Sequence, residues 1–265
     1  MTVSVPSPVS VVRLDEIAVI TLDRPKANAI DAPTSVLLYQ AVHAAEMDPG
    51  VRAIVLTGGG DRFFSAGWDL KAAVAGEAAD ADWGPGGFAG ITEYVGRRKP
   101  LVAAVNGLAL GGGFELMLAC DLAVCSDGAE FAVPEVTLGL VADAGGLLRL
   151  PRRLPRAVAI ELLLTGRRMD ADEARRWGLV NDVVPAADLL SSAIALAQRA
   201  IAGAPLAVGA VLEVLEATET LDVVDGFALM RSGELATYAA VAASDDAQEG
   251  PLAFSERRAP RWTGR

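Results

Sequence analysis

Residues 108–121, LALGGGFELMLACD, place three consecutive glycines and one glutamate inside an otherwise apolar stretch. Glycine weakens helices and strands because it loses more backbone freedom on folding, and a buried carboxylate is costly unless other interactions compensate for it. A helix that begins at Gly111–Gly113 would present backbone N–H groups with no side chain in front of them, so a substrate oxygen can approach closely. The stretch therefore predicts an oxyanion site, followed one helical turn later by Glu115.

The sequence around this stretch alternates between strand and helix patterns. Residues 9–25 predict a β-hairpin, residues 33–47 a helix with apolar side chains at helical spacing, and VRAIVLTGGG (51–60) a buried strand. Further strands are expected at 101–107, 122–127 and 130–135, and helices at 112–121 and from Gly145 onward. This order indicates an α/β protein.

Two regions depart from that alternation. Residues 76–90 combine glycine, proline and acidic residues and predict a long surface loop or lid, a kind of segment that often carries specificity. From about residue 186 the pattern is nearly all helical, with breaks at 203–205 and 244–246. We therefore expect a core at 1–200, which holds the substrate site, and a C-terminal helical region at 201–265.

Composition excludes several classes of function. The net charge of −11 argues against binding to nucleic acid or to an anionic membrane. The apolar run 101–114 is interrupted by Asn106 and glycines and is too short for a membrane span, and the N-terminus shows no secretory leader. Cys120 and Cys125 lie in apolar sequence, which is typical of buried free thiols. A cytoplasmic protein is expected.

Carboxylates are the main groups available for catalysis. The only histidine, His43, lies on the first predicted helix, so neither Ser-His-Asp catalysis nor a metal site is expected, and no P-loop or dinucleotide fingerprint occurs. Glu115 and Glu135 have apolar neighbours in the sequence, and burial raises the pKa of a carboxyl, which suits it to proton transfer near neutral pH. Each could instead cap a helix or pair with an arginine such as Arg149 or Arg152.

Several motifs resemble those of the crotonase (enoyl-CoA hydratase/isomerase) superfamily, nearly end to end. They are RPKANAID (24–31), FSAGWDLKAA (64–73), AAVNGLALGGGFELMLACDLAV (103–124), FAVPEVTLGL (131–140), AGGLLRLPR (144–152) and LLTGRRMDADEARRWGLVNDVV (163–184). The resemblance implies an α/β fold built as a spiral of ββα repeats, with a C-terminal helical trimerisation region. Stretches such as DADWGPGGFAG (80–90) are most similar to the carnitinyl-CoA dehydratase subfamily.

The resemblance also implies a reaction, the reversible syn hydration of a 2-enoyl-CoA thioester by a hydro-lyase. The backbone N–H groups of Trp68 and Gly112 would bind the thioester oxygen and stabilise the enolate. Glu115 would activate the water and Glu135 would transfer the proton at C2, or the two would share these roles. The subfamily substrate would be crotonobetainyl-CoA. Coenzyme A enters as part of the substrate, and no permanently bound cofactor is expected.

The matched motifs suggest binding positions as well. Coenzyme A is expected along Lys26, Ala27, Ala66, Asp69 and Leu70. A trimethylammonium group needs an aromatic or anionic wall, and a carboxylate needs a cation. The candidates for the wall are Trp68, Trp83, Phe88, Tyr94 and Asp143, and those for the cation are Arg97 and Arg98. Trp83 and Phe88 could instead serve only to pack the loop, and Lys26 could be a solvated surface lysine with no role in binding.

Two other functions stay open at this point. One is a crotonase-fold enzyme with a different preference, a general enoyl-CoA hydratase or an enoyl-CoA isomerase. The other is a non-catalytic crotonase-fold binding protein, against which the acidic charge and the two glutamates count. The expected partners are an acyl-CoA thioester and further copies of this chain, as a homotrimer or a hexamer, with no nucleic acid and no membrane.

Overall fold

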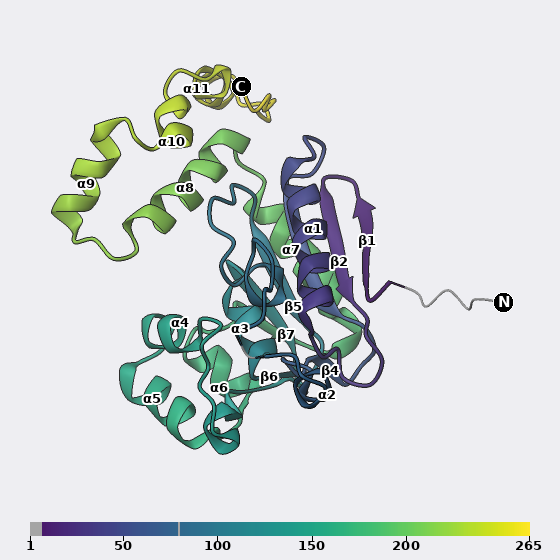
Figure 1. Ribbon diagram of the computed structural model, residues 1–265. Coiled ribbons are helices and arrows are strands. Elements are labelled where there is room, and N and C mark those ends of the chain that lie inside the picture. The colour runs from purple at the N-terminus through teal and green to yellow at the C-terminus, as the bar shows by residue number, and fades with distance from the viewer. Residues whose placement is uncertain (1–6, 79) are drawn as a thin grey trace.

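The computed structural model describes residues 7–78 and 80–265 (Figure 1). Residues 1–6, part of the stretch in which no leader is expected, and Ala79, within the expected loop, lie outside the described residues. The larger sheet, in spatial order, consists of β1 (Val9–Leu14), β2 (Ile17–Leu22), β3 (Ala53–Gly58), β5 (Leu101–Val105), β7 (Leu122–Ser126) and β10 (Asp182–Val184). The smaller sheet consists of β4 (Phe63–Ser65), β6 (Leu108–Leu110), β8 (Glu130–Ala132) and β9 (Met169–Asp170).

Helices cover these sheets and then extend beyond them (Figure 1). They are α1 (Ala32–Met47), α2 (Leu70–Val74), α3 (Gly112–Leu118), α4 (Gly146–Arg153), α5 (Arg156–Thr165), α6 (Ala171–Arg176), α7 (Leu189–Ala200), α8 (Pro205–Thr218), α9 (Val223–Ser232), α10 (Ala236–Val241) and α11 (Asp245–Ser255). Short 3-10 turns are η1 (Phe88–Gly90), η2 (Pro134–Leu138) and η3 (Ala186–Asp188). The mixed α/β class expected from the sequence is confirmed.

The larger sheet has helices on both faces, which explains its apolar strands. β1 and β2 pair antiparallel, as the predicted hairpin requires, and the remaining pairs in this sheet are parallel. Strands β3 and β5 are buried along almost their whole length, as expected for parallel strands covered on two sides. Alternate residues enter two cores: Ala103 belongs to the core that contains α1 and α3, and Ala104 to the one that contains α7.

The segment 76–90 is a loop, but only its first half lies at the surface as predicted. Residues 86–90 are buried, because η1 packs against α1. The backbone N–H of Ala89 donates to the hydroxyl of Ser35 at 3.0 Å, and a Cβ on Gly90 would lie 2.3 Å from the backbone nitrogen of Tyr39. The first helix therefore holds the end of this loop in place.

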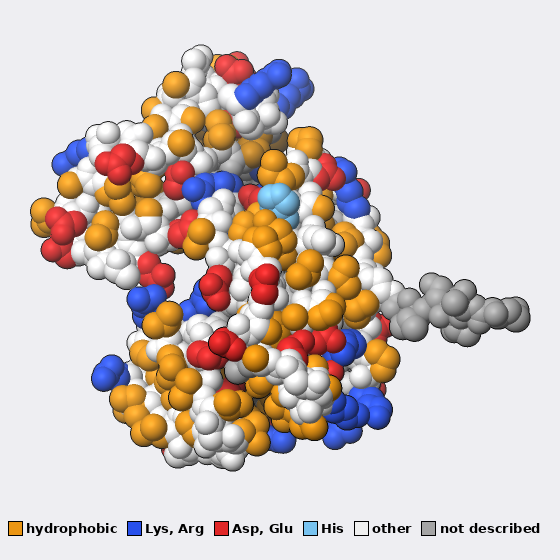
Figure 2. All heavy atoms as spheres, viewed as in Figure 1, with side chains coloured by type: hydrophobic (Ala, Val, Ile, Leu, Met, Phe, Trp, Pro, Cys, Tyr) orange, Lys and Arg blue, Asp and Glu red, His pale blue; other side chains and the backbone are white. Residues whose placement is uncertain are grey.

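The C-terminal helices α8–α11 stand away from the sheets, and Figure 2 shows an opening between them and the core. Breaks occur at 201–204 and 242–244, overlapping the predicted breaks at 203–205 and 244–246, and two more occur at 219–222 and 233–235. Ser244 caps α11 by accepting from the N–H of Ala247 at 3.1 Å. Among the described residues, no single helix has the length and apolar character to cross a bilayer; 186–200 and α8 qualify only as a pair bent by 97°. The division at residue 200 stays a prediction.

Candidate active site

Three neighbouring parallel strands of the smaller sheet end at the candidate site. β4 pairs with β6, and β6 pairs with β8, each in parallel. The carboxyl ends of parallel strands share one edge of a sheet, where ligands of α/β proteins commonly bind. β4 leads to Trp68, β6 leads to Gly112 and Glu115 on α3, and β8 leads to Glu135 on η2. The topology thus collects residues that are far apart in the sequence.

The two predicted oxyanion groups lie beside one another. Gly67 has φ +77°, and a Cβ there would lie 2.6 Å from the backbone nitrogen of Gly112, so this close approach requires glycine. The N–H of Asp69 donates to the carbonyl of Ile30, which fixes the backbone on the far side of Trp68. Within the described residues, the N–H groups of Trp68 and Gly112 donate to no acceptor, so both are available to a ligand oxygen.

Glu115 is buried at the base of the site, with 3% of its surface exposed. Its Oε1 accepts from the N–H of Gly146, the first residue of α4, at 2.8 Å. That bond and the charge of Arg149 favour ionisation, but burial opposes it more strongly, and the charges of Glu135 and Asp143 add to the opposition. Together they raise the pKa of Glu115 to about 8.

Glu135 approaches the site from η2 and packs against the glycine turn. Gly111 has φ +54°, and a Cβ on this residue would lie 2.7 Å from the Oε1 of Glu135. Its Oε2 is buried and has no hydrogen-bond partner among the described residues. Burial, and then the charge of Asp143, raises the pKa of Glu135 above its usual value. A buried, unpaired carboxylate oxygen is costly, which is typical of a functional group rather than a structural one.

The arginines considered as partners of these glutamates are engaged elsewhere. Arg149 donates to the carbonyl of Thr92 at 2.7 Å, and Arg152 forms an ion pair with Glu219 at 3.2 Å. Within the described part of the chain, Glu115 and Glu135 form no ion pair. Of the two structural alternatives, pairing with an arginine is therefore wrong, whereas Glu115 does accept from the first backbone N–H of α4, as a capping side chain does.

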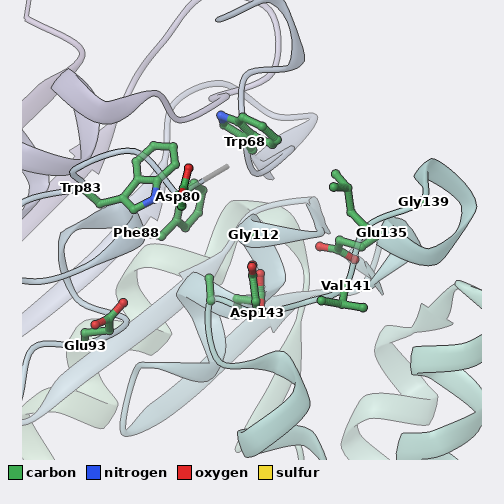
Figure 3. A pocket seen from close by; sticks show the side chains of 13 residues that line it. Trp68, Asp80, Trp83, Phe88, Glu93, Gly112, Glu135, Gly139, Val141 and Asp143 are labelled. Atoms are coloured by element: carbon green, nitrogen blue, oxygen red, sulfur yellow. The ribbon is translucent and has the colours of Figure 1, made fainter. Parts of the chain in front are cut away.

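Both carboxylates open onto a cavity of about 460 Å³ (Figure 3). It is lined by Trp68, Asp80, Trp83, Phe88, Glu93, Gly112, Glu115, Glu135, Gly139, Leu140, Val141, Asp143 and Ala144. Among these described residues, five are Asp or Glu and none is Lys or Arg. The rings of Trp68 and Trp83 meet edge to face with centroids 6.4 Å apart, and those of Trp83 and Phe88 do so at 5.1 Å. The cavity is aromatic on one side and acidic around it.

Three residues considered for the acyl pocket lie outside this cavity. The hydroxyl of Tyr94 is hydrogen-bonded to the ring of His43 at 2.8 Å, on the exposed side of α1. Arg97 forms an ion pair with Asp121 at 2.9 Å, and Arg98 forms one with Glu213 at 3.0 Å. Sequence reasoning missed two acidic residues of the lining, Asp80 and Glu93; their positions on either side of Trp83 and Phe88 were the only available signal.

The positions predicted for coenzyme A lie together near the ends of β2 and β4. The N–H of Ala66 donates to the carbonyl of Ala27 at 2.9 Å. Asp69 already has a structural role, because it accepts from Arg24 at 2.6 Å and caps α2 through the N–H of Lys71 at 3.0 Å. Leu70 is exposed, and so is Lys26. Among the described residues, no group of three or more His, Cys, Asp or Glu is arranged to hold a metal ion.

Known proteins share both this sequence and this fold. Residues 13–265 match the enoyl-CoA hydratase/isomerase family. Carnitinyl-CoA dehydratases from Salmonella typhi and Citrobacter koseri are 56% and 57% identical over 246 residues, which is 93% of this chain and 94% of each of those proteins.

Solved structures give the same result. Enoyl-CoA hydratase from Mycobacterium tuberculosis H37Rv aligns with a TM-score of 0.89 and 44% identity, covering 97% of this chain and 99% of that one. Carnitinyl-CoA hydratase from Mycobacterium avium aligns with a TM-score of 0.76 and 43% identity, covering 98% of this chain and 100% of that one. The chain belongs to the enoyl-CoA hydratase/isomerase family, the crotonase superfamily expected from its motifs.

Proposed function

We propose that this protein is a hydro-lyase that interconverts crotonobetainyl-CoA and carnitinyl-CoA by adding or removing water. Family membership supports the hydratase class, and the relatives named carnitinyl-CoA dehydratase support this acyl group. The observation that carries the proposal is the cavity itself. It joins two carboxylates of raised pKa to two free N–H groups, and its wall is aromatic and acidic.

In this mechanism the thioester oxygen lies between the N–H groups of Trp68 and Gly112. Negative charge on that oxygen grows as the enolate forms, and donors held in place beforehand stabilise it without reorganising. The glycines at 67 and 111–113 allow the close packing that holds these donors: a Cβ on Gly67 would lie 2.6 Å from the nitrogen of Gly112, and one on Gly113 would lie 2.1 Å from the carbonyl oxygen of Ser65. Loss of one such donor costs about 10²–10³ in kcat in comparable sites.

The two glutamates exchange roles between the two directions of the reaction. Because the pKa of Glu115 is about 8, Glu115 carries a proton in the free site at neutral pH, and the mechanism pairs it with an ionised Glu135. That state suits dehydration: Glu135 takes the C2 proton, and Glu115 protonates the hydroxyl leaving C3 as water. Hydration uses the opposite state, in which Glu115 takes a proton from water and Glu135 delivers one to C2. Both groups act from one face, which gives syn addition.

The charge of the cavity fits the acyl group. The carboxyl of carnitine is consumed in the thioester, so its trimethylammonium is the only charge left on the acyl chain. The cavity offers the rings of Trp68, Trp83 and Phe88 and the carboxylates of Asp143 and Glu93, which together suit a quaternary ammonium. No cation such as Arg97 or Arg98 is required, which corrects the expectation of a carboxylate partner.

Other parts of the chain fit the same proposal. Lys26, Ala27, Ala66, Asp69 and Leu70 would flank coenzyme A as they do in the family pattern. The helices α8 and α9 would form the contacts of a homotrimer, which can pair into a hexamer; they expose a series of large apolar side chains. These are Val211, Leu215, Val223, Val224 and Phe227. The two buried free thiols fit a reducing, cytoplasmic location.

The experiment compares the hydration of crotonobetainyl-CoA and crotonyl-CoA through loss of the absorbance of the conjugated thioester. We expect a preference for crotonobetainyl-CoA, and a fall in kcat of about 10²–10⁴ in Glu115→Gln and in Glu135→Gln. Glu234→Gln, on the exposed surface, is the matched control. A preference for crotonyl-CoA would indicate a general enoyl-CoA hydratase, and full activity in either site variant would refute the two-glutamate mechanism.

A further inference from the structure

Glu77 joins two parts of the molecule at the start of the loop 76–90. Its Oε1 accepts from the indole Nε1–H of Trp68 at 2.8 Å, and its Oε2 accepts from the backbone N–H of Ala32 at 3.0 Å. Ala32 is the first residue of α1, where backbone N–H groups lack partners within the helix and a negative charge is favourable. Both oxygens of the half-buried carboxylate are therefore used.

The indole that Glu77 holds is the first of three rings in a row. Trp68 meets Trp83 at an interplanar angle of 87°, and Trp83 meets Phe88 at 75°. The ring of Phe88 in turn covers Gly112, because a Cβ there would lie 2.4 Å from its Cε1. The row thus begins at the ring that Glu77 holds and ends at the second oxyanion glycine. Its three rings lie along one wall of the cavity (Figure 3).

We propose that Glu77 is a positioning residue that sets acyl selectivity by fixing the orientation of the Trp68 indole. Glu77 is not among the described residues that line the cavity, so it acts through the ring rather than on the substrate. Rotation of the indole away from Glu77 would break the hydrogen bond that Nε1–H donates to Glu77, and it would also break the edge-to-face contact with Trp83. The flat surface offered to a quaternary ammonium would then be lost. The inference rests on the proposed function, because it assigns that wall to the acyl group.

A double-mutant cycle tests this dependence. Glu77→Ala is expected to raise the KM for crotonobetainyl-CoA about tenfold, as for loss of a hydrogen bond to a charged group, with a smaller change in kcat. For crotonyl-CoA, which carries no cation, the KM should change less. In a Trp68→Phe background, which keeps the backbone N–H but lacks the indole N–H, Glu77→Ala should have no further effect. An equal effect in both backgrounds overturns the proposal.

The chain offers matched controls. Away from the cavity, Glu173 accepts from the indole of Trp177 at 3.3 Å and from the guanidinium of Arg167 at 2.7 and 2.8 Å. Glu173→Ala therefore removes an indole contact together with an ion pair, and it should still leave the KM ratio of the two substrates unchanged. Glu77→Gln keeps one acceptor oxygen and should fall between wild type and Glu77→Ala. A loss of selectivity in the Glu173 variant equal to that in the Glu77 variant would mean that general loosening, not ring position, is responsible.

A readout without substrate separates this proposal from the assigned reaction. With isotope-labelled tryptophan, solvent exchange of the Trp68 indole proton, identified by its absence in Trp68→Phe, should quicken at least severalfold in Glu77→Ala. Unchanged exchange overturns the proposal. If wild type instead prefers crotonyl-CoA, the proposed acyl group is wrong, and the exchange rate, which needs no substrate, still decides whether Glu77 positions the ring.

Discussion

Replacing Gly111 by alanine has two effects, backbone strain at residue 111 and displacement of Glu135, and a second variant separates them. The residue has φ +54° and ψ −127°, outside the left-handed helical region, where a side chain costs about 1–3 kcal/mol. The new Cβ would also lie 2.7 Å from Oε1 of Glu135, so the carboxylate must move about 0.7 Å to reach an ordinary contact of 3.4 Å. A displacement near 1 Å costs about 10²-fold in a well-oriented site, so we expect kcat to fall about 10- to 100-fold.

The matched variant is Gly178→Ala. Gly178 has φ +73° but no atom within 4 Å of its Cβ position, so it carries the strain without the collision. Thermal unfolding should show a loss in both variants, about 2–4 °C for each kcal/mol. Hydration kinetics measured across pH should show the loss of kcat only in Gly111→Ala. Equal activities in the two variants would refute the placement of Glu135 against the glycine turn.

Three further outcomes follow from the structure. Because folding raises the pKa of Glu115 from 4.5 to about 8, the native state binds more protons in that range, and this contribution to stability falls as pH rises from 4.5 to 8. Urea unfolding at several pH values should show a flatter dependence in Glu115→Gln. Arg24→Ala, which leaves Asp31 and Asp69 without their 2.6 Å partner, should lower the free energy of unfolding by about 2 kcal/mol in denaturant titrations; no change would contradict a shared clamp. Ser244→Ala removes the cap of α11 and should cost about 1 kcal/mol in the same assay, whereas an unaltered midpoint would show that the cap is dispensable.

Local sequence patterns were sufficient for much of the fold. The hairpin, the helix at 32–47 and the helix that follows the glycines depend on periodicity and on turn residues, which act over a few positions. Glu115 and Glu135 could be identified from the sequence as candidate acid–base residues, because few residues capable of proton transfer have apolar neighbours on both sides. Their roles stay predictions until the variants are measured.

Long-range packing accounts for what the sequence did not reveal. The end of the loop 76–90 is buried by Ser35 and Tyr39, which precede it by about fifty residues. Arg97 and Arg98 were misplaced because Asp121 and Glu213, the carboxylates that pair with them, are distant in the sequence. No periodicity specifies such partners, because side chains meet only after strands and helices are assembled.

The cavity draws its wall and its proton-transfer groups from different segments. Asp80, Trp83 and Phe88 belong to one loop, whereas Glu115 and Glu135 belong to α3 and η2. We therefore expect that exchanging residues 80–84 for those of a relative changes substrate choice, while the proposed proton-transfer groups stay in place. The buried end at 86–90 would serve as the fixed attachment point for such a graft.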